Sequence, residues 1–335
     1  MHPKSFEKMQ LKLSGLFALV LAVLTVSCTR ESSNTVQIRD YAEQYAADRL
    51  AIDEFLDTHY MVVDPTSYDI DFYKIPDGGT QVSIKDQTEY PLKDTLINED
   101  GITYKVDFIK FREGTQKRPT QVDSVHVAYK GLTLDLSTFD QAESPVWFLL
   151  ESVISGWSHM LPNFKSGTYT STPGQPLNFQ NYGAGILFLP SGLGYYNGIT
   201  GTIGSYQPLI FSFKLVEMQY RDHDRDGILS KDERAFPITN WSNNPTDYDT
   251  DSDGIPNYRD IDDDNDYYYT KNERLAGTFV SPVSGANVNY YYPLFGASTD
   301  DPATPWDESK GIPDCNGDYT TPTRTPRHLN KNCHE

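Results

Sequence analysis

Residues 125–218 contain five short segments, in the order VHVAYKG (125–131), FD (139–140), VISGW (153–157), LPSGLGY (189–195) and PLIFSFKLVEM (208–218). Apolar and polar residues alternate in the first and last segments. They alternate again in ITYKVDFIKF (102–111), where Tyr104, Val106 and Phe108 share one face. This period of two predicts half-buried antiparallel strands. Residues 153–164 offer the best position for a short helix. The sequence therefore predicts an α+β domain with a curved antiparallel sheet wrapped on one helix.

The five segments together resemble the FKBP-type peptidyl-prolyl cis-trans isomerases. Several short motifs in one order are far rarer by chance than any of them alone. The resemblance implies the FKBP fold over residues 101–219. It also implies a pocket for prolyl peptides, at the positions that match the family: Tyr129, Phe139, Asp140, Val153, Ile154, Trp157, Tyr195, Ile203 and Phe211.

The resemblance gives these residues separate roles. Trp157 would form the pocket floor, and Tyr129, Phe139 and Phe211 would form its walls. The Ile154 N–H and the Tyr195 hydroxyl would hold the substrate backbone, with Asp140 near the twisted carbonyl. One wall position that is usually aromatic in the family is expected at Val146, next to Trp147. The loops at 168–185 and 195–207 also depart from the family pattern.

Prolyl isomerisation needs no nucleophile, no proton transfer and no cofactor. The barrier to amide rotation is about 18–20 kcal/mol because resonance flattens the bond. An enzyme lowers this barrier by binding the twisted amide better than either planar form. An apolar pocket that removes water from the carbonyl is sufficient for this task.

A strongly acidic segment follows the predicted isomerase domain. Residues 222–273 hold fifteen Asp or Glu against five Lys or Arg. Three loops place oxygen-bearing residues at positions 1, 3, 5, 7, 9 and 12, which is the spacing that wraps a protein chain around Ca²⁺. The predicted ligands are Asp222, Asp224, Asp226, Ser230, Glu233 and the Ile228 carbonyl in loop 1; Asp249, Asp251, Asp253, Asn257, Asp260 and the Ile255 carbonyl in loop 2; and Asp262, Asp264, Asp266, Thr270, Glu273 and the Tyr268 carbonyl in loop 3.

Two details qualify this calcium prediction. Tyr267 replaces the turn glycine in loop 3, which should strain that loop. Loops 2 and 3 are almost contiguous, so no helices fit between them and paired EF-hands are excluded. The arrangement resembles thrombospondin type 3 repeats, in which structural calcium organises the backbone. The alternative is a solvated acidic tract.

The N-terminus is typical of an exported lipoprotein. Lys4, Lys8 and Lys12 precede the apolar run 13–26, which leads to Cys28. This pattern predicts a signal peptide over residues 1–28 with lipidation of Cys28. The alternative is an ordinary cleaved signal with an incidental cysteine.

The remaining segments give weaker signals. A helix is predicted from Val36 to about His59, as a packing or dimerisation element within an N-terminal region, residues 29–100. Residues 220–275 form the calcium repeats, and residues 276–335 form an extended tail. Cys315 and Cys333 are expected to form a disulfide in an exported chain, with two free thiols as the alternative.

These features predict a lipid-anchored prolyl isomerase in the cell envelope. It would be an outer-membrane lipoprotein that faces the periplasm or the surface, binds structural Ca²⁺ and acts on proline-containing client polypeptides. The net charge of −19 argues against nucleic acid as a partner. Two alternatives stay open: a prolyl-peptide binding or chaperone module, and a calcium-stabilised structural lipoprotein.

Overall fold

A computed structural model describes residues 38–233, 245–281 and 283–333. Internal contacts divide the chain into Met1–Ile38 and Arg39–Glu335, and all elements below belong to the second unit. The predicted signal peptide and Cys28 lie outside the described residues. Within these ranges, none of the helices has the length and apolar character needed to span a membrane.

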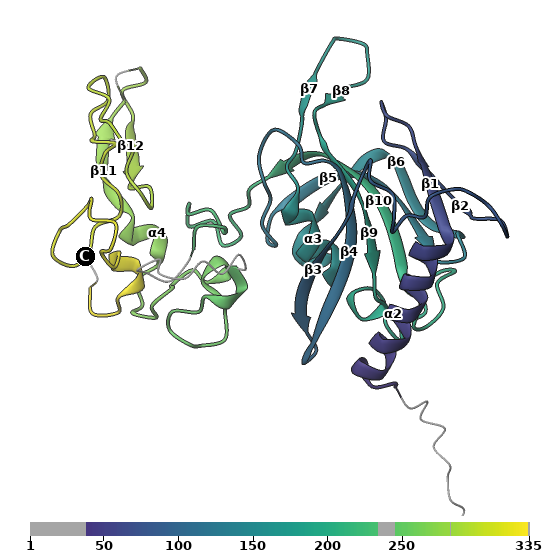
Figure 1. Cartoon of the computed structure of the whole chain (residues 1–335). Helices are drawn as coiled ribbons and strands as arrows, with labels where there is room; N and C mark the ends of the chain where they lie inside the picture. Colours follow the sequence, from purple (N-terminus) through teal and green to yellow (C-terminus); the bar gives the residue numbers. More distant parts are fainter. Residues whose placement is uncertain (1–37, 234–244, 282, 334–335) are drawn as a thin grey trace, which may run out of the picture. The chain divides into compact units, whose positions relative to one another are not determined.

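The main sheet has six strands in the order β3-β4-β9-β10-β5-β6, and every neighbouring pair is antiparallel (Figure 1). Its edge strand β3 precedes residue 101, so the sheet begins inside the segment predicted as an N-terminal region. The strands are β3 (Leu92–Glu99), β4 (Ile102–Arg112), β5 (Ser124–Thr133), β6 (Thr138–Leu149), β9 (Gly183–Leu189) and β10 (Leu209–Gln219).

One face of the sheet packs on the predicted short helix, α3 (Ser155–Met160). Tyr104, Val106 and Phe108 of β4 lie in the same apolar core as Trp157, as the alternation predicts. Three 3₁₀ turns complete this side: η1 (Leu150–Ser152), η2 (Leu161–Asn163) and η3 (Ser191–Leu193). The antiparallel sheet and short helix predicted from residues 102–218 are confirmed.

The other face of the sheet is covered as well, so the prediction of half-buried strands is wrong for its central strands. Helix α2 (Tyr41–Thr58) packs Ile52, Phe55 and Leu56 against residues of β4, β9 and β10. The hairpin of β1 (His59–Val63) and β2 (Ile70–Lys74) joins this second core. As a result, β9 is buried at every position.

Helix α2 begins later than Val36, because Asp40 caps it by accepting the N–H groups of Ala42 and Glu43. The helix is tied to η3 through Asp48, whose Oδ2 accepts both the N–H and the hydroxyl of Ser191 at 2.7 Å. The N-terminal helix is therefore part of the same packed body as the sheet.

The remaining elements are short. They are β7 (Thr168–Thr170), β8 (Asn178–Gln180), η4 (Pro245–Asp247), η5 (Asn257–Arg259), α4 (Thr270–Glu273), β11 (Leu275–Val280), β12 (Asn287–Tyr291) and η6 (Arg327–Leu329). The hairpin β7–β8 lies in the long loop 168–185. Cys315 and Cys333 are joined by a disulfide, with their Cα atoms 5.3 Å apart.

Candidate functional site

A cavity of about 450 Å³ opens at one end of α3. Seven of the nine predicted pocket residues line it, together with two that were not predicted. The lining residues are Tyr129, Asp140, Phe148, Ser152, Val153, Ile154, Trp157, Tyr195 and Phe211.

Trp157, predicted as the floor of the pocket, lines this cavity. Its indole is 3% exposed, and three rings stand edge-on around it. The ring centroids of Tyr129, Phe211 and Phe148 lie 5.1, 5.3 and 5.5 Å from that of Trp157. Edge-to-face packing of this kind adds to the stability gained from burial, so the aromatic floor and walls form a rigid set.

Polar groups occupy the rim. The Tyr129 hydroxyl donates to Asp140 Oδ2 at 2.6 Å. Burial and this hydrogen bond raise the pKa of Tyr129 well above its usual range. Burial, and secondarily the charge of Asp140, also raise the pKa of Tyr195. Both phenols therefore remain hydrogen-bond donors at neutral pH.

The backbone at the start of α3 adds another donor. The Ile154 carbonyl accepts the N–H groups of Trp157 and Ser158 at 3.0 and 3.2 Å, which begins the helix. No hydrogen bond from the Ile154 N–H is found within the described part of the chain. This N–H group belongs to a residue that lines the cavity.

Two predicted pocket residues lie behind the cavity. Phe139 packs edge-on against Phe211, with centroids 5.4 Å apart, and Ile203 is 2% exposed in the core. Gly131 makes room for Phe139, since a Cβ at Gly131 would lie 2.5 Å from that ring. Phe139 and Ile203 therefore support the walls.

Phe148, two residues beyond Val146, forms a wall of the cavity, and Val146 does not line it. Three residues of β6, Glu143–Pro145, stand opposite Ala128 alone, which shifts the register of β6 against β5. Val146 pairs with Val127 and is exposed, while Trp147 stacks on His126. The sequence signal for Phe148 was its aromatic side chain two residues beyond Val146.

The three acidic loops share one backbone conformation, although one lacks glycine. Position 6 has φ of 94° at Gly227, 96° at Gly254 and 72° at Tyr267. In each loop the carboxylate of the first aspartate accepts a hydrogen bond from the backbone N–H of the residue at position 6, with N···O distances of 2.9 to 3.1 Å. Tyr267 therefore adopts the turn that its glycine counterparts adopt.

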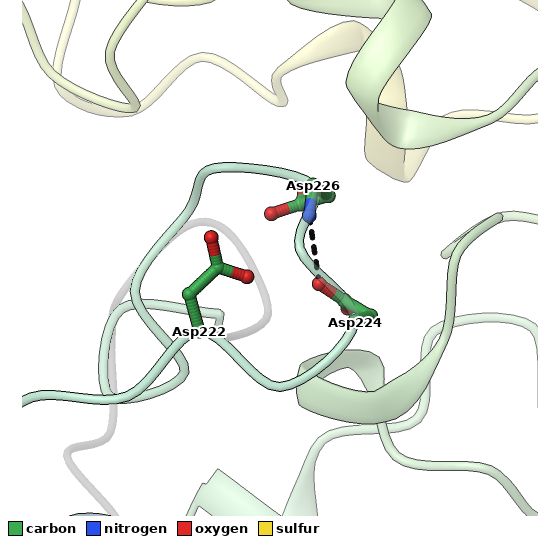
Figure 2. Close-up of side chains that lie close together, drawn as sticks. All are labelled: Asp222, Asp224 and Asp226. Carbon is green, nitrogen blue, oxygen red and sulfur yellow. Dashed lines mark hydrogen bonds between the residues drawn. The ribbon is translucent and has the colours of Figure 1, made fainter.

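Each loop gathers its three alternating aspartates. In every loop, one carboxylate oxygen from each lies within 4.8 Å of the others. Figure 2 shows this in loop 1, where Asp222, Asp224 and Asp226 surround a common space and the Asp226 N–H donates to Asp224. Carboxylates this close repel one another unless a cation is bound between them.

The three loops differ in the burial of the acidic residue at position 12, which closes each loop. Glu233 of loop 1 and Glu273 of loop 3 are 3% and 1% exposed, and both oxygens of each are buried without a hydrogen bond to any residue that the structure describes. Burial and neighbouring aspartates raise the pKa of Glu233 to about 12 and that of Glu273 to about 9. Asp260 of loop 2 is only partly buried and accepts the Asp262 N–H. The carboxylates of loops 1 and 3 thus fit a calcium ion best.

The three residues at position 9 close their loops. In each loop the position 9 side chain accepts a hydrogen bond from the backbone N–H of the residue at position 2, with N···O distances of 2.8 to 3.2 Å. The accepting atoms are Ser230 Oγ, Asn257 Oδ1 and Thr270 Oγ1. Their backbone N–H groups donate to the carbonyl just before the loop. The sequence did not predict this role for the position 9 side chains.

Comparison with known proteins gives relatives for two segments. Residues 223–306 match the family model BamM_C, described as BamM C-terminal. A segment of 122 residues is 31% identical to the probable FKBP-type peptidyl-prolyl cis-trans isomerase FkpA of Neisseria meningitidis, covering 35% of this chain and 38% of that protein. A segment of 129 residues is 30% identical to the peptidyl-prolyl cis-trans isomerase Mip of Coxiella burnetii, which covers 37% of this chain and 47% of that protein.

A third relative, the outer membrane protein MIP of Legionella longbeachae, is 28% identical over 128 residues, which is 37% of this chain and 47% of that protein. The chain thus spans less than half the length of these curated relatives.

Solved structures give fold likenesses at low scores. The peptidyl-prolyl cis-trans isomerase of Pseudomonas syringae is 22% identical with a TM-score of 0.34, covering 55% of this chain and 98% of that one. FkpA of Escherichia coli is 18% identical with a TM-score of 0.32, and the match covers 65% of this chain and 74% of that one. The chain therefore has homologues among the FKBP-type peptidyl-prolyl isomerases, over about a third of its length, and its residues 223–306 match the BamM C-terminal model.

Proposed function

We propose that the chain is an FKBP-type peptidyl-prolyl cis-trans isomerase that acts on X-Pro bonds of exported polypeptides. The observation that carries this proposal is the cavity over Trp157, with three rings edge-on to its floor and hydrogen-bond donors at its rim. A proline ring fits an apolar, aromatic space of this kind.

The rim residues would favour the twisted amide. The Ile154 N–H and the Tyr195 hydroxyl would hold the peptide backbone on either side of the proline. Removal of water by the aromatic walls would weaken the resonance that keeps the amide planar. Asp140, held by Tyr129, would face the rotating carbonyl carbon. No step requires a cofactor or a proton transfer.

The proposed location is the cell envelope. One relative is named as an outer membrane protein, and the C-terminal segment matches a BamM model. Lipid anchoring through Cys28 rests on the sequence pattern alone. The proposed clients are proline-containing polypeptides on the periplasmic or outer side of that envelope.

A protease-coupled prolyl isomerase assay tests this function. The chain from residue 29 onward is needed, because α2 packs on the sheet and β3 is its edge strand, and a fragment starting at 101 would lack both. Wild type should accelerate isomerisation, and Phe211→Ala and Asp140→Ala should reduce it. Activity that neither change affects would rule out this pocket. Binding of a prolyl peptide without acceleration would favour the binding-module alternative.

We also propose that loops 1 and 3 bind structural Ca²⁺. The supporting observation is the pair of buried glutamates, Glu233 and Glu273, whose four oxygens form no hydrogen bonds within the described part of the chain. Calcium takes six to eight oxygen ligands and suits such carboxylates. Thermal stability and protease resistance of residues 220–275 should both rise with Ca²⁺. If neither changes, the calcium proposal is wrong and the isomerase proposal stands.

A further inference from the structure

Helix α2 carries a buried carboxylate that the proposed reaction does not use. Asp48 is 2% exposed, and its Oδ2 accepts the backbone N–H and the hydroxyl of Ser191, each at 2.7 Å. Its Oδ1 accepts Nε2 of Gln44 at 2.6 Å. A buried carboxylate destabilises a fold unless donors surround it, so these three hydrogen bonds make Asp48 a specific polar contact between α2 and η3.

Ser191 in turn holds the segment that carries Tyr195. The Ser191 carbonyl accepts the N–H groups of Gly194 and Tyr196 at 3.0 and 2.9 Å, and these two residues flank Tyr195. Ser191 is fully buried, whereas Tyr195 lines the cavity. The place of the Tyr195 side chain at the cavity therefore depends on Ser191, four residues earlier in the chain.

The far side of this turn is also held by the start of α2. Tyr196 has φ of 48°, which is unfavourable for a residue with a Cβ and needs support from its surroundings. Tyr41 stacks on the Tyr196 ring, with centroids 4.2 Å apart and planes at 14°. The Tyr196 hydroxyl donates to the Arg39 carbonyl. Residues 39–48 thus anchor the turn on both sides of Tyr195.

We propose that Asp48 is a positioning residue for the isomerase site, because through Ser191 it holds the turn that brings the Tyr195 hydroxyl to the cavity. This inference rests on the proposed isomerase function. A displacement of a substrate-binding group by about 1 Å can lower a rate by up to about 100-fold, so such support matters for activity as well as for stability. Helix α2 would then belong to the working site.

Isomerase kinetics on the chain from residue 29 test the inference. Asp48→Ala and Tyr195→Phe should each lower kcat/KM by about 10-fold, the scale of one lost hydrogen bond. The double variant should lose no more than the worse single variant, because both changes remove the same donor from the substrate. Asp48→Asn keeps an oxygen that can accept from Ser191, so it should retain most of the activity.

Ile52→Ala is the matched control for lost stability. Ile52 lies on the same helix, is 0% exposed, and packs in the core on the other face of the sheet. This variant should lower the melting temperature through the cavity it leaves, and should not change kcat/KM of the folded protein. If Ile52→Ala lost as much kcat/KM as Asp48→Ala, general stability would explain both effects and the inference would be overturned.

Nuclear magnetic resonance of the chain with isotope-labelled tyrosine follows the Tyr195 ring independently of activity. The Tyr195 signal, identified by its loss in Tyr195→Phe, should shift in Asp48→Ala and stay in place in Ile52→Ala. An unchanged signal in Asp48→Ala, wild-type kcat/KM in that variant, or losses that multiply in the double variant would each overturn the inference. A wild-type chain that does not accelerate isomerisation would refute the proposed function instead, and the Tyr195 signal would still decide whether Asp48 positions that side chain.

Discussion

The hydroxyl of Tyr129 lies 2.6 Å from Oδ2 of Asp140, and this bond links adjacent strands at the mouth of the cavity. Tyr129 also stands edge-on to the Trp157 floor. One side chain therefore connects the aromatic base of the pocket to the carboxylate that lines it. The two residues should act on a substrate as a unit.

Removing either member of this pair should reduce catalysis without unfolding the protein. We expect Tyr129→Phe and Asp140→Ala each to lower kcat/KM by about 10-fold, equivalent to about 1.4 kcal/mol of transition-state stabilisation. The double variant should lose no more than the worse single variant. Additive losses in the isomerase assay would show that the residues act separately. Unchanged melting temperatures are the control.

Phe148 should matter more than its neighbour Trp147. Its ring touches both Tyr129 and Trp157, while Trp147 stacks on His126 outside the cavity. We expect Phe148→Ala to raise KM for a prolyl peptide by about 10-fold, about 1.4 kcal/mol of lost contact. Trp147→Ala removes a larger ring and should leave KM unchanged. The opposite ranking would contradict the observed wall.

The sequence predicted most of the pocket because its residues lie in contiguous motifs. Phe148 was missed because the register shift at Glu143–Pro145 depends on pairing with β5, which local alternation does not reveal. The sequence analysis also did not predict that α2 and the β1–β2 hairpin cover the second face of the sheet. A signal for it existed in GAGILFL (183–189), a nearly continuous apolar run typical of a strand buried on both sides. The contact between loops 1 and 3, in which Arg274 Nη1 donates to the Asp226 carbonyl, joins residues far apart in the sequence and has no local signal.

Replacing Tyr267 by glycine should raise the stability of loop 3. Its φ of 72° is unfavourable for a residue with a Cβ, and its side chain is 90% exposed. Tyr267→Gly should therefore stabilise calcium-loaded loop 3 by up to about 1 kcal/mol. Tyr269→Gly is the control, since Tyr269 has φ of −62° and glycine there should destabilise. Melting in excess Ca²⁺ measures both, and a lower melting temperature for Tyr267→Gly would contradict the argument.

The closing acids should differ in their effect on calcium-dependent stability. Glu233→Gln and Glu273→Gln each remove a buried carboxylate that has no hydrogen bond to the described residues, so each should abolish much of the rise in melting temperature that Ca²⁺ produces. Asp260→Asn should have a smaller effect, because Asp260 is partly exposed and already accepts a backbone N–H. The comparison needs melting curves with excess Ca²⁺ and with chelator. If the three variants lost the same share of the calcium-dependent rise in melting temperature, burial of the position 12 carboxylate would not determine how much each loop contributes.

Asp48 should make stability depend on pH. Burial raises its pKa, although Ser191 and Gln44 donate to it. The folded chain therefore holds this proton more tightly than the unfolded chain, whose aspartate pKa is about 3.9. The contribution is fully present below that value and is lost as pH rises through the folded pKa. Relative to Asp48→Asn, wild type should thus lose unfolding free energy as the pH rises above about 4, measured by denaturant titration with tryptophan fluorescence. Asp57→Asn, more exposed on the same helix, controls for the loss of one carboxylate. A wild-type advantage that grows with pH would mean that the ionised form of Asp48 stabilises the α2 contact with η3.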